Sequence, residues 1–181
     1  MKAGVFLDRD GTIVADPGYL RDPADVVLLP GAGQAIARLN AAGRTVVVVT
    51  NQSGIARGKL SPDDFDAVTR RIEELVRGAG GHIDATYMCP HAPEVGPCEC
   101  RKPGLLLYRR ALRALQIDPA CSWWVGDRES DLTPAPLLGG RGILVLTGEG
   151  VHHREAAEAL GFGAAAGLPE AVGRILTPNA N

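Results

Sequence analysis

Two aspartates separated by one residue are the first feature of the chain that could do chemistry. Asp8 and Asp10 come directly after a short apolar run from Ala3 to Leu7, and Gly11 follows them. Side chains at positions i and i+2 share a face while the backbone stays extended, so the two carboxylates can converge where the run ends. Paired carboxylates repel each other unless a cation compensates, and Mg²⁺ prefers oxygen ligands. The pair therefore predicts a magnesium site; the alternative is a polar turn closed by Asx hydrogen bonds.

Two other apolar runs also end in polar residues. The run at 45–49 is followed by hydrogen-bonding side chains and a glycine, namely Thr50, Asn51, Gln52, Ser53 and Gly54. Donor-rich loops of this kind suit phosphate oxygens, although a plain polar turn has the same composition. The run at 122–125 leads to Asp127, a third carboxylate that could complete an octahedral cation site. Asp131 lies four residues further on and is expected either to support that site or to cap the backbone.

Three of the four cysteines lie within twelve residues, beside one histidine. They form the set Cys89, His91, Cys98 and Cys100, while Cys121 stands apart. Three thiolates and one imidazole are the ligand set of a closed structural zinc site, with no position left for water. We therefore expect zinc to fold the loop at residues 89–100 rather than to activate a nucleophile. A chance clustering of buried thiols is the alternative.

A basic pair, Arg101 and Lys102, directly follows this cluster. The chain has three lysines against sixteen arginines, so a lysine inside a motif is informative. An ammonium is a point charge that can bridge a phosphate and a carboxylate, whereas a guanidinium prefers to chelate one partner. The alternative for the pair is a solvated basic surface. His152 and His153 have no comparable context, and we expect them to face solvent.

The segments that must position these residues alternate between apolar strands and helices. Strands are predicted at 3–7, 45–49, 83–88, 122–125 and 142–146, and helices at 32–40, 61–77 and 105–115, followed by a helical, alanine-rich tail. Ser61 and Pro62 mark the start of the second helix as its cap and first-turn proline. Strands of near-continuous Val, Ile and Leu predict a parallel sheet covered on both faces, with ligands at the carboxyl ends of the strands.

Length and composition indicate one globular domain spanning residues 1–181. Apolar residues make up 45% of the chain and charged residues 22%, and the formal charge is −2, which argues against a nucleic-acid-binding face. No apolar run approaches the roughly 20 residues that span a bilayer, and no signal-peptide pattern is present. We expect a cytoplasmic protein that binds neither nucleic acid nor membrane, and a monomer because no apolar stripe is left over.

The motifs together resemble the D-glycero-D-manno-heptose-1,7-bisphosphate 7-phosphatase family of the haloacid dehalogenase superfamily. The resemblance rests on Asp8 to Thr12, Thr50 to Gly58, the Cys/His loop with Arg101 to Pro103, and Val125 to Asp131. It implies an α/β fold, a three-layer, doubly wound, Rossmann-like parallel sheet without a cap domain and with a zinc-binding loop. It also implies a magnesium-dependent phosphomonoesterase that removes the 7-phosphate of a heptose bisphosphate through an aspartyl-phosphate intermediate.

The same resemblance implies roles for individual residues. Asp8 is expected to be the nucleophile and Asp10 the general acid and then base, with Thr50, Arg101 and Lys102 completing the catalytic set. Mg²⁺ is expected on the carboxylates of Asp8 and Asp127 and on the backbone carbonyl of Asp10. Substrate contacts are expected from Asp16, Gly18, Tyr19, Thr50, Asn51, Gln52, Ser53, Arg101, Lys102 and Arg128.

Two alternatives and two departures accompany this interpretation. The alternatives are histidinol-phosphate phosphatase, a group that shares the zinc loop, and an inactive metal-binding scaffold. The segment after Lys102 is two residues shorter than in relatives, because Pro103 and Gly104 lead directly into Leu105. The shortening moves the start of the helix relative to Lys102 and leaves the reach of the lysine open. Prolines at positions 134 and 136 predict a distorted helix after Asp131.

Overall fold

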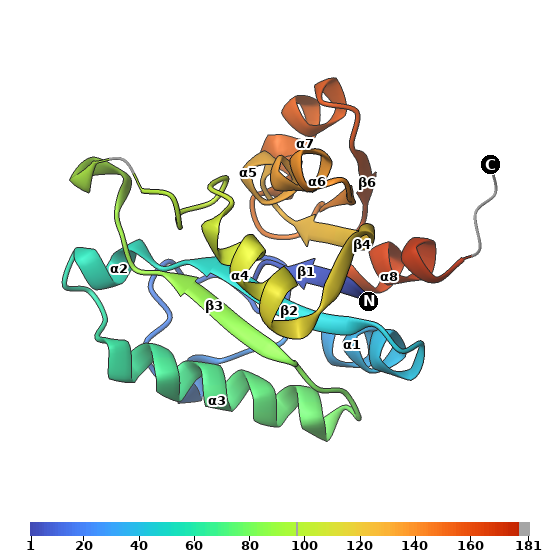
Figure 1. Ribbon diagram of the computed structural model, residues 1–181. Helices are drawn as coiled ribbons and strands as arrows, with labels where there is room; N and C mark the ends of the chain where they lie inside the picture. Colours follow the sequence, from blue (N-terminus) through green and yellow to red (C-terminus); the bar gives the residue numbers. More distant parts are fainter. Residues whose placement is uncertain (97, 178–181) are drawn as a thin grey trace.

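The computed structural model describes residues 1–96 and 98–177, and it contains one sheet of six parallel strands (Figure 1). The strands are β1 (Lys2–Leu7), β2 (Thr45–Asn51), β3 (Ala85–Cys89), β4 (Ile117–Gly126), β5 (Arg141–Val145) and β6 (Gly163–Ala165). Their order across the sheet is β3-β2-β1-β4-β5-β6. The expected extent of 1–181 and the expected loop at 89–100 include residues 178–181 and Pro97, which lie outside the described residues.

Helices cover both faces of this sheet. The α-helices are α1 (Ala32–Ala41), α2 (Ser53–Ala56), α3 (Pro62–Gly78), α4 (Leu106–Leu115), α5 (Glu129–Leu132), α6 (Pro134–Leu138), α7 (Gly150–Ala159) and α8 (Leu168–Leu176). Short 3-10 turns are η1 (Pro23–Asp25) and η2 (Pro93–Val95). Buried side chains of α1, α3 and α8 form one core cluster with the sheet, and those of α4 and α6 join a second on the opposite face. The fold is therefore the predicted doubly wound three-layer sheet.

Strand β2 shows why the central strands are continuously apolar. Val46 and Val48 belong to the cluster beneath α1 and α3, whereas Val47 and Val49 belong to the cluster beneath α4. Successive side chains of a strand point to opposite faces, so a strand between two helical layers has no solvated face. The continuous valine run therefore follows from burial on both sides.

Most predicted elements are confirmed with small shifts of their ends. Helix α3 begins as predicted, because the Ser61 hydroxyl accepts the Asp64 N–H and the Asp64 carboxylate accepts the Ser61 N–H. The prolines after Asp131 divide the expected helix into the short α5 and α6, which confirms the predicted distortion.

Two strand predictions were wrong. The tail was expected to be helical, but it includes the short strand β6 between α7 and α8. Its Gly-Ala-Ala sequence has no β-branched residue, and pairing with β5 overrides that weak local preference. Strand β4 begins at Ile117 rather than Ser122, and its register against β1 shifts between Ala3 and Val5. Pro119 inside this strand concealed its first half from periodicity.

The strand order creates a crevice at one edge of the sheet. The chain proceeds from β1 outward through β2 to β3 and then returns to place β4 on the other side of β1. Ligands bind at such a switch point, beyond the carboxyl ends of the strands. Asp8 and Asp127 follow β1 and β4, so both lie at this point. Among the described residues, none of the helices combines the length and hydropathy that crossing a bilayer requires.

Candidate active site

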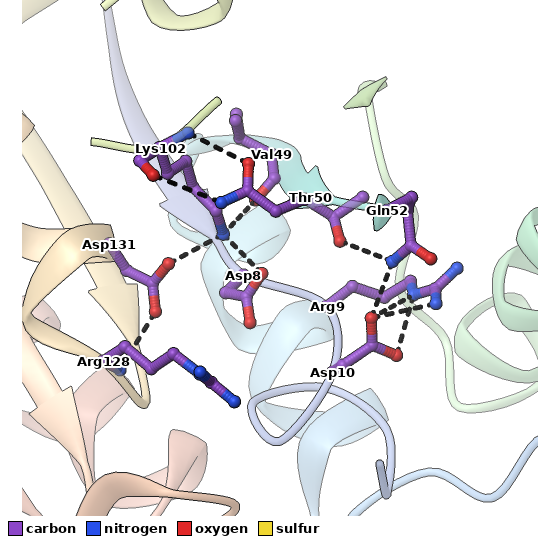
Figure 2. A network of polar contacts seen from close by, with 10 residues as sticks. Asp8, Arg9, Asp10, Val49, Thr50, Gln52, Lys102, Arg128 and Asp131 are labelled. Atoms are coloured by element: carbon purple, nitrogen blue, oxygen red, sulfur yellow. Dashed lines mark hydrogen bonds and ion pairs between the residues drawn. The ribbon is translucent and has the colours of Figure 1, made fainter. Parts of the chain in front are cut away.

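Asp8 lies just beyond the end of β1, with its backbone still tied to the sheet. Its N–H donates to the carbonyl of Val125 at 2.9 Å, continuing the pairing between β1 and β4. The side chain is 10% exposed and faces Lys102, as Figure 2 shows. The carboxylate is thus fixed by two central strands and remains accessible from one side only.

Lys102 reaches Asp8 although the segment after it is shortened. Its buried Nζ lies 2.5 Å from Asp8 Oδ1, 2.7 Å from Asp131 Oδ1 and 2.8 Å from the carbonyl oxygen of Val49 (Figure 2). These contacts use all three donors of an ammonium group. The shortened segment therefore does not keep Lys102 from Asp8.

Asn51 fixes the backbone of this lysine. Its side-chain oxygen accepts the Lys102 N–H at 2.9 Å, and its amide nitrogen donates to the Lys102 carbonyl at 3.3 Å. A side-chain amide that satisfies both backbone groups of one residue holds that residue as a neighbouring strand would. Strand β2 thereby positions a lysine that lies 51 residues further along the chain.

Three carboxylates meet beside the ammonium group. One oxygen from each of Asp8, Asp127 and Asp131 lies within 4.8 Å of the others. Asp127 Oδ2 accepts the Glu149 N–H at 2.8 Å, while its buried Oδ1 has no hydrogen-bond partner within the described chain. Buried polar atoms are seldom left unpaired, so the geometry fits a cation at Asp127 Oδ1.

Asp131 caps the backbone, which is one of the two roles that its spacing predicted, and it also pairs with Lys102. Its Oδ2 accepts the Arg128 N–H at 3.0 Å and so caps α5, and its Oδ1 pairs with Lys102 at 2.7 Å. A Cβ atom at Gly126 would approach the Asp131 carboxylate to 2.3 Å, so only glycine leaves room for this side chain. The predicted capping role is therefore confirmed, and support of a cation site by Asp131 stays a prediction.

The electrostatics of the cluster favour a bound cation. Burial raises the pKa of Asp8 to about 8, opposed by Lys102 and increased by the charges of Asp131 and Asp127. Burial likewise raises the pKa of Asp127 to about 6. Burial disfavours the ammonium form of Lys102, but the carboxylates of Asp131 and Asp8 outweigh it and hold its pKa above the ordinary value. A divalent cation would favour the ionised form of each carboxylate.

Asp10 is oriented away from this cluster by a separate network. Arg9 Nη2 lies 2.9 Å from Asp10 Oδ2, and Gln52 Nε2 donates to the same oxygen at 2.7 Å and to Thr50 Oγ1 at 2.9 Å (Figure 2). Arg9 is buried and packs over the Phe65 ring at 5.6 Å. The sequence did not identify Arg9 as a site residue, because a single arginine between two aspartates has no distinctive local pattern.

A cavity of about 470 Å³ opens over these groups. Every residue predicted to touch substrate lines it, namely Asp16, Gly18, Tyr19, Thr50, Asn51, Gln52, Ser53, Arg101, Lys102 and Arg128. Gly54, Arg57 and Ser130 also line it and were not predicted as site residues. Four basic side chains, Arg57, Arg101, Lys102 and Arg128, line this cavity together with the buried Asp8 carboxylate, and such a lining suits a phosphorylated small molecule.

The predicted metal-ligating cysteines and histidine also converge. Side-chain ligand atoms of Cys89, His91, Cys98 and Cys100 lie within 4.8 Å of one another, and all four cysteines of the chain are free thiols. Four soft ligands gathered around one point, with no room for an open position, fit a tetrahedral zinc ion. Cys89 ends β3 and pairs in register with Asn51, so the base of the loop is fixed by the sheet.

Comparisons with known proteins identify the family. The D-glycero-beta-D-manno-heptose-1,7-bisphosphate 7-phosphatase of Haemophilus ducreyi is 41% identical over 157 residues, which cover 83% of this chain and 86% of that protein. The enzyme of the same name from Vibrio cholerae is 42% identical over 155 residues, covering 82% and 83%. The chain belongs to this phosphatase family. A family profile described as HAD-hydrolase-like matches residues 99–171.

A solved structure of the same family agrees with the fold. The D,D-heptose 1,7-bisphosphate phosphatase of B. bronchiseptica, crystallised with magnesium and phosphate, superposes with a TM-score of 0.88 at 36% identity. The match covers 96% of this chain and 98% of that one. These relatives favour the heptose phosphatase interpretation over a histidinol-phosphate phosphatase and over an inactive scaffold.

The prediction that both histidines face solvent is confirmed for His152 and wrong for His153. His152 is exposed as expected, with its side chain 77% accessible. His153 is half-buried instead, and its Nδ1 contacts Glu129 Oε2. Helix α7 packs against α5, which places one face of α7 on the protein and the other in solvent. Two adjacent helical residues point in directions about 100° apart, so the pair could not share one environment.

Proposed function

We propose that this enzyme hydrolyses the 7-phosphate of D-glycero-β-D-manno-heptose 1,7-bisphosphate through an aspartyl-phosphate on Asp8. The observation that carries the proposal is the Asp8 carboxylate held 2.5 Å from Lys102 Nζ at the floor of a polar cavity. The choice of sugar and of the β anomer is supported by the names of the relatives.

In the first step, an oxygen of Asp8 attacks the phosphorus of the 7-phosphate. The bond between phosphorus and the C7 oxygen breaks, and Asp10 gives its proton to the leaving sugar oxygen. Lys102 and the Thr50 hydroxyl stabilise charge on the transferring oxygens. The position of Lys102 between Asp8 and Asp131 supports this role.

In the second step, water attacks the phosphorus of the aspartyl-phosphate. Asp10, now ionised, accepts a proton from that water, the bond between phosphorus and the Asp8 oxygen breaks, and inorganic phosphate leaves. Arg9 and Gln52 hold the Asp10 carboxylate in one orientation through both steps. Asp16, Gly18, Tyr19, Asn51, Gln52, Ser53, Arg101 and Arg128 are proposed to contact the sugar and its second phosphate.

Two metal ions are part of the proposal. Asp8, Asp127 and the Asp10 backbone carbonyl would hold Mg²⁺, which supplies positive charge for the transferring phosphoryl group. The unpartnered Asp127 Oδ1 supports this site. Cys89, His91, Cys98 and Cys100 would hold a structural Zn²⁺ that shapes the loop before Arg101 and Lys102. We further propose a single cytoplasmic phosphatase domain that is monomeric.

The deciding experiment is a measurement of phosphate release in the presence of Mg²⁺. The substrates are the α and β anomers of heptose 1,7-bisphosphate and histidinol phosphate, compared at equal concentrations. We expect the highest kcat/KM with the β anomer and heptose 1-phosphate as the product. Preference for histidinol phosphate, or no release from any of the three, contradicts the proposal.

A further inference from the structure

Arg57 connects three separate segments at the mouth of the cavity. It stands at the carboxyl end of α2 and lines the cavity. Its Nη1 donates to the Tyr19 hydroxyl at 3.0 Å and to Ser53 Oγ at 3.3 Å. Its Nε and Nη2 donate to the two carboxylate oxygens of Glu94 at 2.6 and 3.0 Å. One guanidinium thus joins the segment after β1, the loop after β2 and the Cys/His loop.

The contact with Glu94 has the strong bidentate geometry. Two parallel N–H···O bonds between a guanidinium and a carboxylate are charge-assisted and fix direction as well as distance. Glu94 lies in η2, at the tip of the Cys/His loop. The base of that loop is joined to the same region by backbone bonds, from Gln52 N to Cys89 O at 2.7 Å and from Ala56 N to Pro90 O at 3.2 Å. Arg57 adds the only side-chain ion pair that the described residues give to the loop tip.

Tyr19 is held from two sides. Its hydroxyl accepts from Arg57, and its ring lies so close to Gly54 that a Cβ atom there would approach Tyr19 Cδ1 to 2.7 Å. Gly54 is therefore required for the ring to pack against α2. Tyr19 remains 40% exposed and faces the cavity, so its position sets the shape of the entrance.

We propose that Arg57 is a positioning residue that locks Tyr19 and Glu94 around the part of the substrate remote from the reacting phosphate. This inference rests on the proposed function. The guanidinium is committed to Glu94 and Tyr19, so it shapes the site rather than binding the second phosphate itself. Loops that are already ordered lose less conformational entropy when a ligand binds. The contacts of Arg57 with Tyr19 and Glu94, which we call the lock, therefore lower KM without taking part in the chemical step.

The kinetic test compares Arg57→Ala and Arg57→Lys with Arg71→Ala. Arg71 forms an exposed ion pair with Glu74 on α3, away from the cavity, and is the matched control. We expect Arg57→Ala to raise KM for the heptose bisphosphate about tenfold, the scale of one charge-assisted hydrogen bond, with kcat within about twofold. Hydrolysis of p-nitrophenyl phosphate, which has no second phosphate, is expected to stay unchanged. Arg57→Lys should recover only part of the loss, since an ammonium cannot form the fork.

Glu94→Gln separates positioning from direct binding. If Arg57 locks the loops, removal of the Glu94 charge weakens the lock and raises KM. If Arg57 instead binds the second phosphate, the substitution releases the guanidinium and lowers KM, which overturns the proposal. Equal losses for both substrates in Arg57→Ala, or an unchanged KM, also overturn it.

Amide hydrogen exchange tests the lock without any turnover. We expect Arg57→Ala to accelerate exchange in both residues 18–21 and residues 92–96, while Arg71→Ala leaves both segments as in the wild type. Unchanged exchange in either segment overturns the inference. A wild-type enzyme inactive on the heptose bisphosphate would refute the proposed function, and the exchange data would still decide whether Arg57 orders the two loops.

Discussion

The two clusters that can hold a metal ion are positioned in different ways. Asp8, Asp127 and Asp131 follow two adjacent central strands, and each carboxylate has a hydrogen bond or ion pair to the surrounding protein. In the Cys/His cluster only Cys89 lies on a strand, and the other three ligands belong to a loop with partly exposed or exposed side chains. The sheet thus assembles the acidic cluster by itself, whereas in our proposal a bound zinc ion orders the loop.

Lys102 belongs to both regions. It comes two residues after Cys100, yet its ammonium group lies between Asp8 and Asp131. Asn51 joins the regions, because it is the last residue of β2 and binds both backbone groups of Lys102. Disruption of the Cys/His loop is therefore expected to lower activity by displacing Lys102.

The strongest test of the comparison removes the proposed nucleophile from the region that the sheet assembles. Asp8→Asn should lower kcat by about 10⁴-fold, because the amide cannot form the aspartyl-phosphate. The fold should persist, since the substitution removes a buried carboxyl from a cluster of like charges. Phosphate release and thermal unfolding measure the two effects. Appreciable activity of the variant would reject Asp8 as nucleophile.

A second test targets the Cys/His loop, which we propose is ordered by zinc. Cys98→Ser should lower the free energy of unfolding by about 4 kcal/mol, the scale expected when a structural metal is lost. Cys121→Ser is the matched control, because Cys121 is exposed and outside the cluster, and its effect should stay within about 0.5 kcal/mol. Denaturant unfolding with zinc analysis gives both values. Equal stability of the two variants would refute a structural zinc.

A third test breaks the link between the two regions. Asn51→Ala removes both bonds to the Lys102 backbone and should lower kcat about tenfold to a hundredfold, since small misplacements of a catalytic group are costly. Asn40→Ala serves as the control, because Asn40 also binds a distant backbone N–H, that of His82, but lies far from the cavity. Steady-state kinetics of both variants decide the matter. An unaffected kcat in Asn51→Ala would show that the loop positions Lys102 without β2.

The smallest expected effect is on the pH at which the Glu94 carboxyl group titrates. The hydrogen bonds from Arg57 lower the pKa of Glu94 to about 2 from its ordinary 4.5. A depressed folded-state pKa means that this ion pair stabilises the loop fully above pH 4.5 and is lost only as the pH falls through about 2. A carboxyl ¹³C NMR titration of Glu94 measures this, and in Arg57→Ala the midpoint should return toward 4.5. Identical midpoints in both proteins would show that the two side chains do not pair in solution.

Local sequence patterns predicted the elements that carry their own signals. The valine run of β2 and the cap of α3 are examples, because burial on two faces and a capping box each depend on residues close together in the sequence. Strand β6 and the first half of β4 escaped prediction, since an Ala-rich triplet and a strand containing a proline take their structure from the neighbouring strands. Tertiary pairing overrides intrinsic preference at such positions.

Within the site, the sequence by itself determined which side chains arrive at the strand ends and which four residues can gather a soft metal. It could not determine that Lys102 meets Asp8 across 94 residues, that Asp131 both caps α5 and pairs with Lys102, or that Arg57 holds Glu94 across 37. Such contacts depend on strand order and register, which determine the side chains that come into contact once the whole sheet has formed. Only the tertiary structure decides them.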